Sequence, residues 1–494
     1  MAQASGLLAF SGLPDIPDSH RASSPGLRKR VGAGENGGGM AGKAKSGKTG
    51  MGDWIQYGFF RLVEGVIRLL PLAICHGLGV GIGTMFWAVS GHYRRLVRRN
   101  LRIAGGIEGT DPELPGLVRR TFQLICANLV CGARTATMSV EQLRQHLETE
   151  GVEHINRALS DSGSTLIVIP HMGNWELLAQ AVRFYAPPGA RGGAIYRPLN
   201  NPLIDALVRR RRQAQGTVLL SRTDGFHKVC SFLREGGGMG ILADQRAGHK
   251  GVLAPFFGRL SSCSGLPELL AKRTGATVIS VSLSTIGPGR WRFHFRPVED
   301  LSTAGVMEAL TLAMSDSLTD VFWFHNRWRI DKRRPLDFYV KRPKVQRFDL
   351  VTKPFRVVVS CRGLGAEARA AIEEMLAARP DLLVEALDDD ASPAIPEGHE
   401  RVRRVAFDAT APDSEIARAL VRLDDESPHP LDAAILLDGD RRLAEACRKL
   451  GLRSVVGACS DPETHPWTRT VPPGRSAGDW REIARAFGAV PIES

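Results

Sequence analysis

The sequence predicts an α/β protein with a mixed, largely parallel sheet flanked by helices, followed by a second, smaller Rossmann-like α/β unit. Short apolar segments rich in β-branched residues alternate with helical segments between residues 163 and 296. From about residue 353 a new strand–turn–helix–strand pattern begins. Charge also separates the two parts, because residues 1–345 carry a net charge of about +19 and residues 346–494 about −6. A chain of 494 residues is therefore expected to fold as two or three units.

Residues 1–50 are rich in Gly, Ser, Ala, Lys and Arg, a composition that buries too little apolar surface to offset the entropy of ordering. We expect a disordered basic leader there, without a secretory signal. The eight cysteines show no C-x-x-C pair, and the thirteen histidines form no His-x-x-x-His cluster. They predict reduced cytoplasmic thiols, no metal site and no cofactor.

Residues 51–104 are expected to form a membrane-anchoring apolar segment and a basic cluster. Residues 69–90 contain no Asp, Glu, Lys or Arg, which is long enough for about one membrane span. Three interpretations stay open: a span or re-entrant anchor, an amphipathic helix in the interface, or a buried hairpin of a soluble fold. The segment is followed by five arginines, which indicate a cytoplasmic-facing second anchor on an anionic leaflet: Arg94, Arg95, Arg98, Arg99 and Arg102.

The body of the protein, residues 105–345, is expected to hold the functional site. Residues 113–160 fit helices that pack over the sheet as a lid or wall. Sites in such folds gather at the carboxyl ends of strands. Three polar groups follow predicted strands in this way: His171, Tyr196-Arg197 and Asp244-Gln245-Arg246.

The central motif is the segment 166–178, in which the buried strand LIVI is followed by PHMGNWELL. A loop histidine at the end of a core strand is suited to act as a general base, and a carboxylate within reach fixes its tautomer. His171 and Glu176 are five residues apart, so they meet only if His171 lies in the loop and Glu176 in the first helical turn. The alternative is a hydrogen-bonded surface histidine beside a glutamate at a helix N-terminus.

Other polar groups have two interpretations each. Arg197 is either a clamp for a substrate phosphate or a salt-bridge partner of Asp205. Asp244 either orients the acceptor or the hydrogen-bond network of the site, or caps a turn. The basic quartet at residues 209–212 is a solvated helix face or a docking surface for an acidic carrier protein. Residues 256–258 (FFG) are apolar wall, either core or acyl-chain lining.

Residues 323–329 (WFHNRWR) interleave aromatic and basic side chains. This pattern is typical of grooves for single-stranded nucleic acid, and equally of a membrane interface. The neighbouring apolar anchor favours lipid, so we expect a membrane and no nucleic acid as partner.

Five blocks in collinear order resemble the bacterial lipid A biosynthesis (lauroyl/myristoyl) acyltransferase family, over about residues 52–340: PHMGNWE, YRPLNNPL, LADQR, PFFG and WFHNRW. The first block carries the His-x4-Asp/Glu motif of that family. The resemblance implies a glycerolipid acyltransferase-like fold with His171 and Glu176 as catalytic residues. It also implies substrate-binding residues at Asn174, Tyr196, Arg197, Asn201, Asp244, Gln245 and Arg246.

The function implied by the resemblance is transfer of a fatty acyl chain from an acyl thioester to a hydroxyl of a lipid A precursor or related glycolipid. The resemblance also implies acyl carrier protein or acyl-CoA as donor. The apolar segment, the arginines that follow it and the unpatterned cysteines predict a site that faces the cytoplasm from the inner membrane. No G-x-S-x-G elbow is present, so direct attack without an acyl-enzyme is expected. The alternative is a non-catalytic, membrane-attached protein that binds anionic lipid on the same fold.

Residues 346–494 are expected to form a Rossmann-like accessory unit. This part faintly resembles half of a heptosyltransferase-type glycosyltransferase, but Cys361-Arg362-Gly363-Leu364-Gly365 is a poor nucleotide loop. No catalytic residue is assigned to it.

Overall fold

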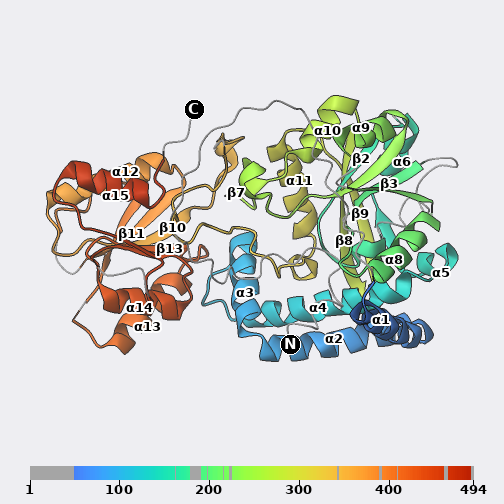
Figure 1. Ribbon diagram of the computed structural model, residues 1–494, viewed down its shortest axis with the longest axis horizontal. Helices are drawn as coiled ribbons and strands as arrows, with labels where there is room; N and C mark the ends of the chain where they lie inside the picture. Colours follow the sequence, from blue (N-terminus) through green and yellow to red (C-terminus); the bar gives the residue numbers. More distant parts are fainter. Residues whose placement is uncertain are drawn as a thin grey trace, which may run out of the picture.

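The computed structural model describes residues 49–161, 163–177, 191–196, 198–214, 216–221, 225–341, 344–388, 392–408, 410–460 and 465–490. Within them, two sheets flanked by helices stand side by side, each with its own apolar core (Figure 1). The expected α/β class with two units is therefore confirmed. The expected leader, apart from residues 49–50, lies outside the described residues.

The N-terminal unit is built on a seven-stranded sheet in the order β1-β9-β8-β2-β5-β3-β4. All neighbours are parallel except β8 and β9, so the sheet is mixed and largely parallel, as predicted. The strands are β1 (Leu147–Glu150), β2 (Thr165–Ile169), β3 (Arg191–Tyr196), β4 (Thr217–Ser221), β5 (Gly237–Leu242), β8 (Thr277–Gly287) and β9 (Arg290–Pro297).

The helices of this unit are α1 (Met51–Leu69), α2 (Leu72–Val89), α3 (Gly91–Gly105), α4 (Leu114–Thr135), α5 (Val140–Arg144), α6 (Val152–Asp161), α8 (Pro202–Ala214), α9 (Phe226–Arg234), α10 (Leu266–Thr274) and α11 (Thr303–Ser315). Short 3-10 turns are η2 (Trp175–Leu177), η3 (Gly248–Lys250) and η4 (Leu318–Asp320). The expected helices of residues 113–160 are present, but residues 147–150 form the edge strand β1 on β9. Those four residues extend the sheet instead of covering it.

Strand β2 lies in the middle of the sheet, between β8 and β5. Its sequence TLIVI is β-branched or apolar throughout, and four of its five residues are buried, which suits a strand covered on both faces. A separate hairpin, β6 (Val252–Phe256) and β7 (Arg259–Cys263), turns at Phe257-Gly258. Both phenylalanines of the FFG segment are buried in the main core, so this segment is core wall.

Helix α2 packs along α4, and two glycines allow the close approach. A Cβ added at Gly79 would lie 2.3 Å from Ala127 Cα, and one at Gly83 would lie 2.4 Å from the Phe122 carbonyl oxygen. The opposite face of α2 is exposed. Among the described residues α2 is the one helix long and apolar enough to cross a membrane by length and composition.

The C-terminal unit has a six-stranded, wholly parallel sheet in the order β12-β11-β10-β13-β14-β15. In chain order this is 3-2-1-4-5-6, the doubly wound order of Rossmann folds, as predicted. Its elements are η5 (Phe348–Leu350), β10 (Phe355–Ser360), η6 (Ala366–Ala368), α12 (Arg369–Ala378), β11 (Leu382–Asp388), β12 (Val402–Ala406), α13 (Asp413–Asp425), β13 (Ala433–Leu436), α14 (Arg441–Leu450), β14 (Val455–Ala458), β15 (Arg469–Val471) and α15 (Ala477–Ala486).

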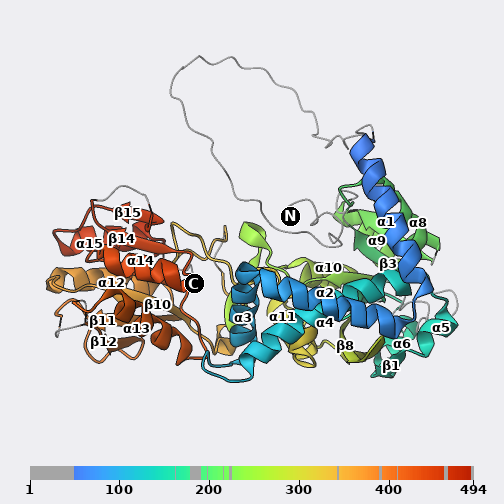
Figure 2. The same cartoon turned by 90° about the horizontal axis from the view of Figure 1, so that it is seen from below.

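The basic helix α3 lies between the two units (Figures 1 and 2). Arg98 pairs with Asp425 at 3.0 Å, Arg99 with Asp432, and the buried Arg102 with Asp424. The prediction that the five-arginine cluster forms a second membrane anchor is therefore wrong for these three. Their charge is compensated by the acidic C-terminal unit, a contact between distant segments that local sequence does not reveal.

Candidate active site

The parallel register of β2 and β5 brings a histidine and an aspartate together. Ile169 is the partner of Leu242 at the carboxyl ends of these neighbouring strands. His171 and Asp244 each follow two residues beyond that pair. Because parallel strands end at the same edge of a sheet, the two side chains meet there without any long loop.

The contact between them is short and buried. His171 Nδ1 lies 2.6 Å from Asp244 Oδ1, and the His171 backbone N–H donates to Oδ2 at 3.1 Å. Burial alone raises the pKa of the Asp244 carboxyl, but the His171 ring and these hydrogen bonds outweigh it and lower the pKa to about 2. An ionised carboxylate only accepts, so Nδ1 carries the proton and Nε2 is left as the basic nitrogen.

The loop that carries His171 is fixed by residues 320–322. The Phe322 backbone N–H donates to the His171 carbonyl at 2.8 Å, and the Gly173 N–H donates to the Asp320 carbonyl at 3.0 Å. Gly173 has φ +56°, and a Cβ there would lie 2.0 Å from the Leu283 carbonyl oxygen. Only glycine fits this turn, so the sequence HMGN places the imidazole against the sheet edge.

The predicted partner of His171 requires correction. Glu176 lies in η2 and accepts two hydrogen bonds from Arg212 of α8, at 2.7 and 3.1 Å. Asp244, not Glu176, is the carboxylate on His171. The chain turns after Gly173, so the Glu176 side chain faces α8 and not His171. The neighbouring strand β5 ends just before Asp244, which places this carboxylate at His171 Nδ1.

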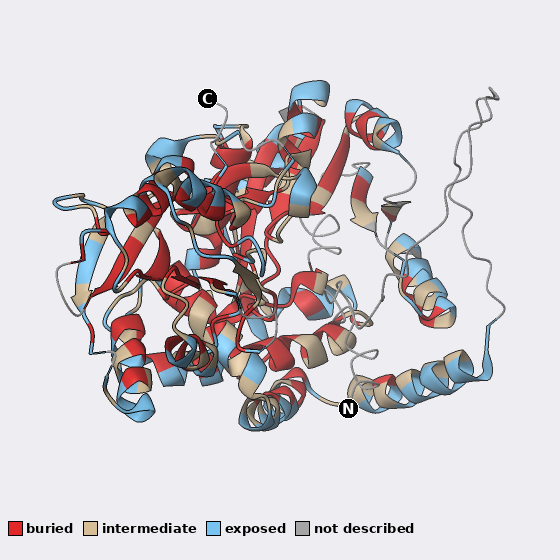
Figure 3. Ribbon diagram, turned by 60° about the vertical axis from the view of Figure 1, so that its left-hand side comes forward, coloured by how far each residue is buried: buried red, intermediate tan, exposed pale blue. Residues whose placement is uncertain are grey.

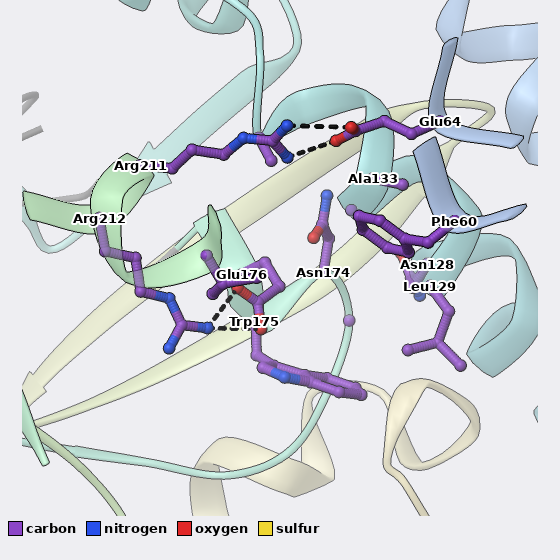
Figure 4. A pocket seen from close by; sticks show the side chains of 14 residues that line it. Phe60, Glu64, Asn128, Leu129, Ala133, Asn174, Trp175, Glu176, Arg211 and Arg212 are labelled. Atoms are coloured by element: carbon purple, nitrogen blue, oxygen red, sulfur yellow. Dashed lines mark hydrogen bonds and ion pairs between the residues drawn. The ribbon is translucent and has the colours of Figure 1, made fainter. Parts of the chain in front are cut away.

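A cavity begins at Gly173, two residues after His171, and is bounded by η2, α4, α8 and α1 (Figure 4). Neither His171 nor Asp244 is part of its wall. Its apolar wall includes Phe60, Leu129 and Val208, and its polar wall includes Asn128 and Asn174. Two ion pairs border it, Arg212–Glu176 and Arg211–Glu64, as the dashed lines of Figure 4 show. Glu64, on α1, is buried, so the N-terminal helix is part of the cavity wall.

The structure distributes the remaining predicted residues among different places. Asn174 is buried, lines the cavity and donates to Thr135 Oγ1 at 3.1 Å. Asn201 is not in the cavity wall: it accepts from the Leu203 and Ile204 backbone N–H groups as a cap of α8, and donates to the Asp53 carbonyl.

Arg197 lies outside the described residues, and so does the side chain of Tyr196. Gln245 follows Asp244 and is partly exposed. Arg246 stacks on Tyr339, 4.9 Å from the ring centroid, at a second cavity.

A second histidine, His325, lies buried near the dyad. Its Nδ1 is 2.9 Å from the Phe322 carbonyl. Burial lowers the pKa of His325 to about 4, and although the Asp244 charge opposes this, Arg327 and His171 add to it. His325 is therefore neutral at neutral pH. Among the described residues no group of three or more His, Cys, Asp or Glu side chains is arranged to hold a metal ion.

The family model of bacterial lipid A biosynthesis acyltransferases matches residues 44–330. The match spans more than half of the chain and contains the whole cavity and the dyad. This chain belongs to the bacterial lipid A biosynthesis acyltransferase family. The resemblance stated from the sequence blocks is thus confirmed, and the protein is an acyltransferase. The C-terminal unit lies beyond the matched residues.

Several characterised relatives are similar over the same region. A phosphatidylinositol mannoside acyltransferase of Mycolicibacterium smegmatis is 25% identical over 260 residues, 51% of this chain and 81% of that protein. A lipid A biosynthesis acyltransferase of Haemophilus influenzae is 25% identical over 39% of this chain and 60% of that protein. A lipid A biosynthesis lauroyltransferase of Escherichia coli is 25% identical over 46% of this chain and 71% of that protein.

Proposed function

We propose that this acyltransferase moves a fatty acyl chain from an acyl thioester to a hydroxyl of a glycolipid, with His171 as general base and Asp244 as its orienting carboxylate. The observation that carries the proposal is the 2.6 Å contact between His171 Nδ1 and Asp244 Oδ1. It leaves Nε2 without a hydrogen-bond partner among the described residues, in the loop whose next residues, from Gly173, line the cavity. A non-catalytic lipid-binding protein has no need of a buried, ionised carboxylate on a histidine.

The reaction follows from this geometry. Nε2 of His171 takes the proton of the acceptor hydroxyl as its oxygen attacks the thioester carbonyl carbon. The tetrahedral intermediate expels the thiolate, which receives the proton from the imidazolium, so ester and free thiol are the products. Asp244 stabilises the imidazolium while it exists, because a negative charge lies against its Nδ1–H. No acyl-enzyme is formed.

The relatives support the substrate class. Their names place them in the acylation of phosphatidylinositol mannoside and in lipid A biosynthesis. We therefore propose a glycolipid acceptor, a lipid A precursor or a related molecule, and acyl carrier protein or acyl-CoA as donor.

The test is an incubation of membranes and purified protein with a labelled acyl thioester, followed by mass analysis of the lipids. His171→Ala should lower the rate of transfer about 10²–10⁴-fold, the range that general-base catalysis contributes. The Arg290→Gln variant serves as control and should keep full activity, because Arg290 is an exposed residue at the start of β9 that pairs with Glu148 and lies outside the cavity wall. Wild-type turnover by folded His171→Ala would contradict the mechanism.

We further propose that α1 and α2 lie in the membrane interface instead of spanning it, on the cytoplasmic face of the inner membrane. One stripe of large apolar side chains is exposed on each helix: Trp54, Ile55, Phe59, Leu62, Val66 and Leu69 on α1, and Ile74, Leu78, Ile82, Met85 and Val89 on α2. Figure 3 colours exposed residues pale blue along the ribbon. The opposite face of α2 is held against α4, and Phe60 and Glu64 on the other side of α1 line the cavity. A helix with one apolar outer face and one face packed on protein suits an interfacial position.

This placement brings the cavity to the membrane surface, where a glycolipid presents its sugar. Flotation with anionic vesicles tests it. The double variant Phe59→Ser/Val66→Ser should lose vesicle binding without loss of thermal stability, because both side chains are more than half exposed. Vesicle binding equal to that of the wild type would contradict the interfacial proposal.

A further inference from the structure

A second cavity lies where the two units meet, and we call it the junction cavity. Its wall comes from the β6–β7 hairpin, the segment after η4, and two residues of the C-terminal unit, Phe355 and Arg379. The wall holds one carboxylate, Asp337, and five arginines: Arg246, Arg259, Arg327, Arg329 and Arg379. Cations therefore outnumber anions at this surface.

Arg259 and Arg379 each have an acidic partner behind the wall. Arg259 pairs with Asp432, and Arg379 binds Asp381 through two hydrogen bonds of 3.0 and 2.8 Å. Arg327 has none. Its guanidinium is wholly buried and donates to Ser261 Oγ, the Ser262 carbonyl and Cys263 Sγ, which are all neutral.

A guanidinium does not lose its proton in proteins, so the Arg327 charge persists in the interior. Its other neighbour is the ring of Phe256, 4.3 Å from the guanidinium carbon. A buried charge without an opposite charge is costly, and an anion in the cavity is the missing counter-charge.

Two hydrogen-bond donors of the wall also favour an anion, because an anion supplies acceptors. Arg327 Nε and Trp328 Nε1 are buried and have no partner among the described residues. Both groups are donors only, so what they lack is an acceptor. A buried donor left unsatisfied costs about 1–3 kcal/mol. Both atoms are closed off from the cavity in this structure, so an acceptor-rich ligand recovers that cost only where the neighbouring side chains move.

The size of the cavity limits the ligand. Its volume is about 40 Å³. Since one water needs about 10–15 Å³, the cavity has room for a few waters or one small tetrahedral oxyanion, but not for a sugar ring or an acyl chain. Arginine forks match the oxygens of phosphate in geometry and charge.

We propose that the junction cavity is a binding site for one phosphate group. The group is either free phosphate or a phosphate carried by a larger molecule whose remainder stays outside the wall. This inference does not depend on His171, because neither His171 nor Asp244 lines the junction cavity.

The experiment is calorimetric titration of the full-length protein with inorganic phosphate, against chloride at equal ionic strength. We expect saturable phosphate binding that Arg246→Gln weakens about tenfold, the effect of one charge-assisted hydrogen bond. Trp328→Phe keeps an aromatic ring, removes one donor and should weaken binding several-fold. Arg290→Gln, an arginine outside both cavities, is the matched control and should bind as the wild type does.

Coenzyme A serves as the second titrant and separates the two sources. If coenzyme A displaces phosphate, and Arg246→Gln weakens the binding of both titrants equally, the site takes a phosphate carried by a larger molecule. If coenzyme A does not compete with phosphate, the site takes free phosphate. The proposal is overturned if phosphate shows no saturable binding, or if Arg246→Gln and Arg290→Gln bind alike. If Arg246→Gln melts at a lower temperature than the wild type, Arg246→Lys replaces it. Lysine keeps the positive charge and removes the paired N–H groups of the guanidinium, so this variant tests those hydrogen bonds alone. His171→Ala should lose acyl transfer and keep phosphate binding, so the two proposals fail separately.

Discussion

Both sheets of this protein end in charged side chains at their carboxyl edges, but the two edges are completed differently. In the N-terminal unit, Asp244 accepts two hydrogen bonds from His171, and the second ring nitrogen stays available. In the C-terminal unit, Arg362 pairs with Asp438 at 3.2 Å and with Asp440, at the switch point between β10 and β13. Ser360 donates to Asp438, and Asp440 caps α14.

The difference lies in whether a group remains for a substrate. The pKa of Asp244 is lowered to about 2, so this carboxylate stays ionised and supports a base. Burial instead raises the pKa of Asp438, although its hydrogen bond from Ser360 and its ion pair with Arg362 oppose this. Similar architecture thus yields a reactive edge in one unit and an internally neutralised edge in the other, which shows that chemistry depends on the site more than on the fold.

The largest expected effect is that of Asp244→Asn, which removes the charge and keeps the volume. The amide no longer fixes the Nδ1–H tautomer or stabilises the imidazolium, so the rate of transfer should fall about 10²–10⁴-fold. The measurement is kcat/KM with a labelled acyl thioester. A decrease below tenfold in a folded variant would show that Asp244 is merely structural.

Acid should destabilise the N-terminal edge through His325. Its pKa is about 4 in the folded protein and about 6.5 in the unfolded chain. Between these values the unfolded state binds the extra proton, so the free energy of unfolding falls as pH falls, by about 3 kcal/mol in total. Urea unfolding at pH 7 and pH 4.5 measures it. His325→Asn keeps a donor for the Phe322 carbonyl and should lose less stability over this interval.

Arg362→Leu, at the carboxyl edge of the C-terminal sheet, should lower the stability of the protein and leave its acyl transfer nearly unchanged. Removing the guanidinium leaves Asp438 and Asp440 without their cation, which should lower the free energy of unfolding by about 2 kcal/mol. Transfer by the folded variant should stay within about twofold of the wild type. A loss of activity as large as that of Asp244→Asn would mean that the two edges do not differ in the way described.

The smallest effect is expected for Glu176→Gln. Glu176 and Arg212 are each about one-fifth exposed, so their ion pair contributes about 1 kcal/mol, and the amide keeps one hydrogen bond to Arg212. The rate should fall less than about tenfold. An effect equal to that of Asp244→Asn would restore Glu176 to the role that its spacing from His171 first indicated.

The sequence by itself determined the local elements and the family. The run TLIVI followed by PHMGN predicts a buried strand ending in a loop histidine, and the strand–helix alternation predicts both sheets. Hydrophobic periodicity and turn residues act over short distances, and this is why they are readable without coordinates. The sequence left the apolar N-terminal segment open between a span, an interfacial helix and a buried hairpin, and the exposed apolar stripe of α1 is known only from the fold.

Only the tertiary structure decided which charges meet. Asp244 is 73 residues from His171 in sequence, and Asp424 is 322 residues from Arg102. Local spacing therefore favoured Glu176 for His171 and the membrane for Arg102, and both expectations changed. Register between parallel strands and docking between units select such partners, because a charge is stabilised by whatever the fold places within a few ångströms, regardless of its position in the chain.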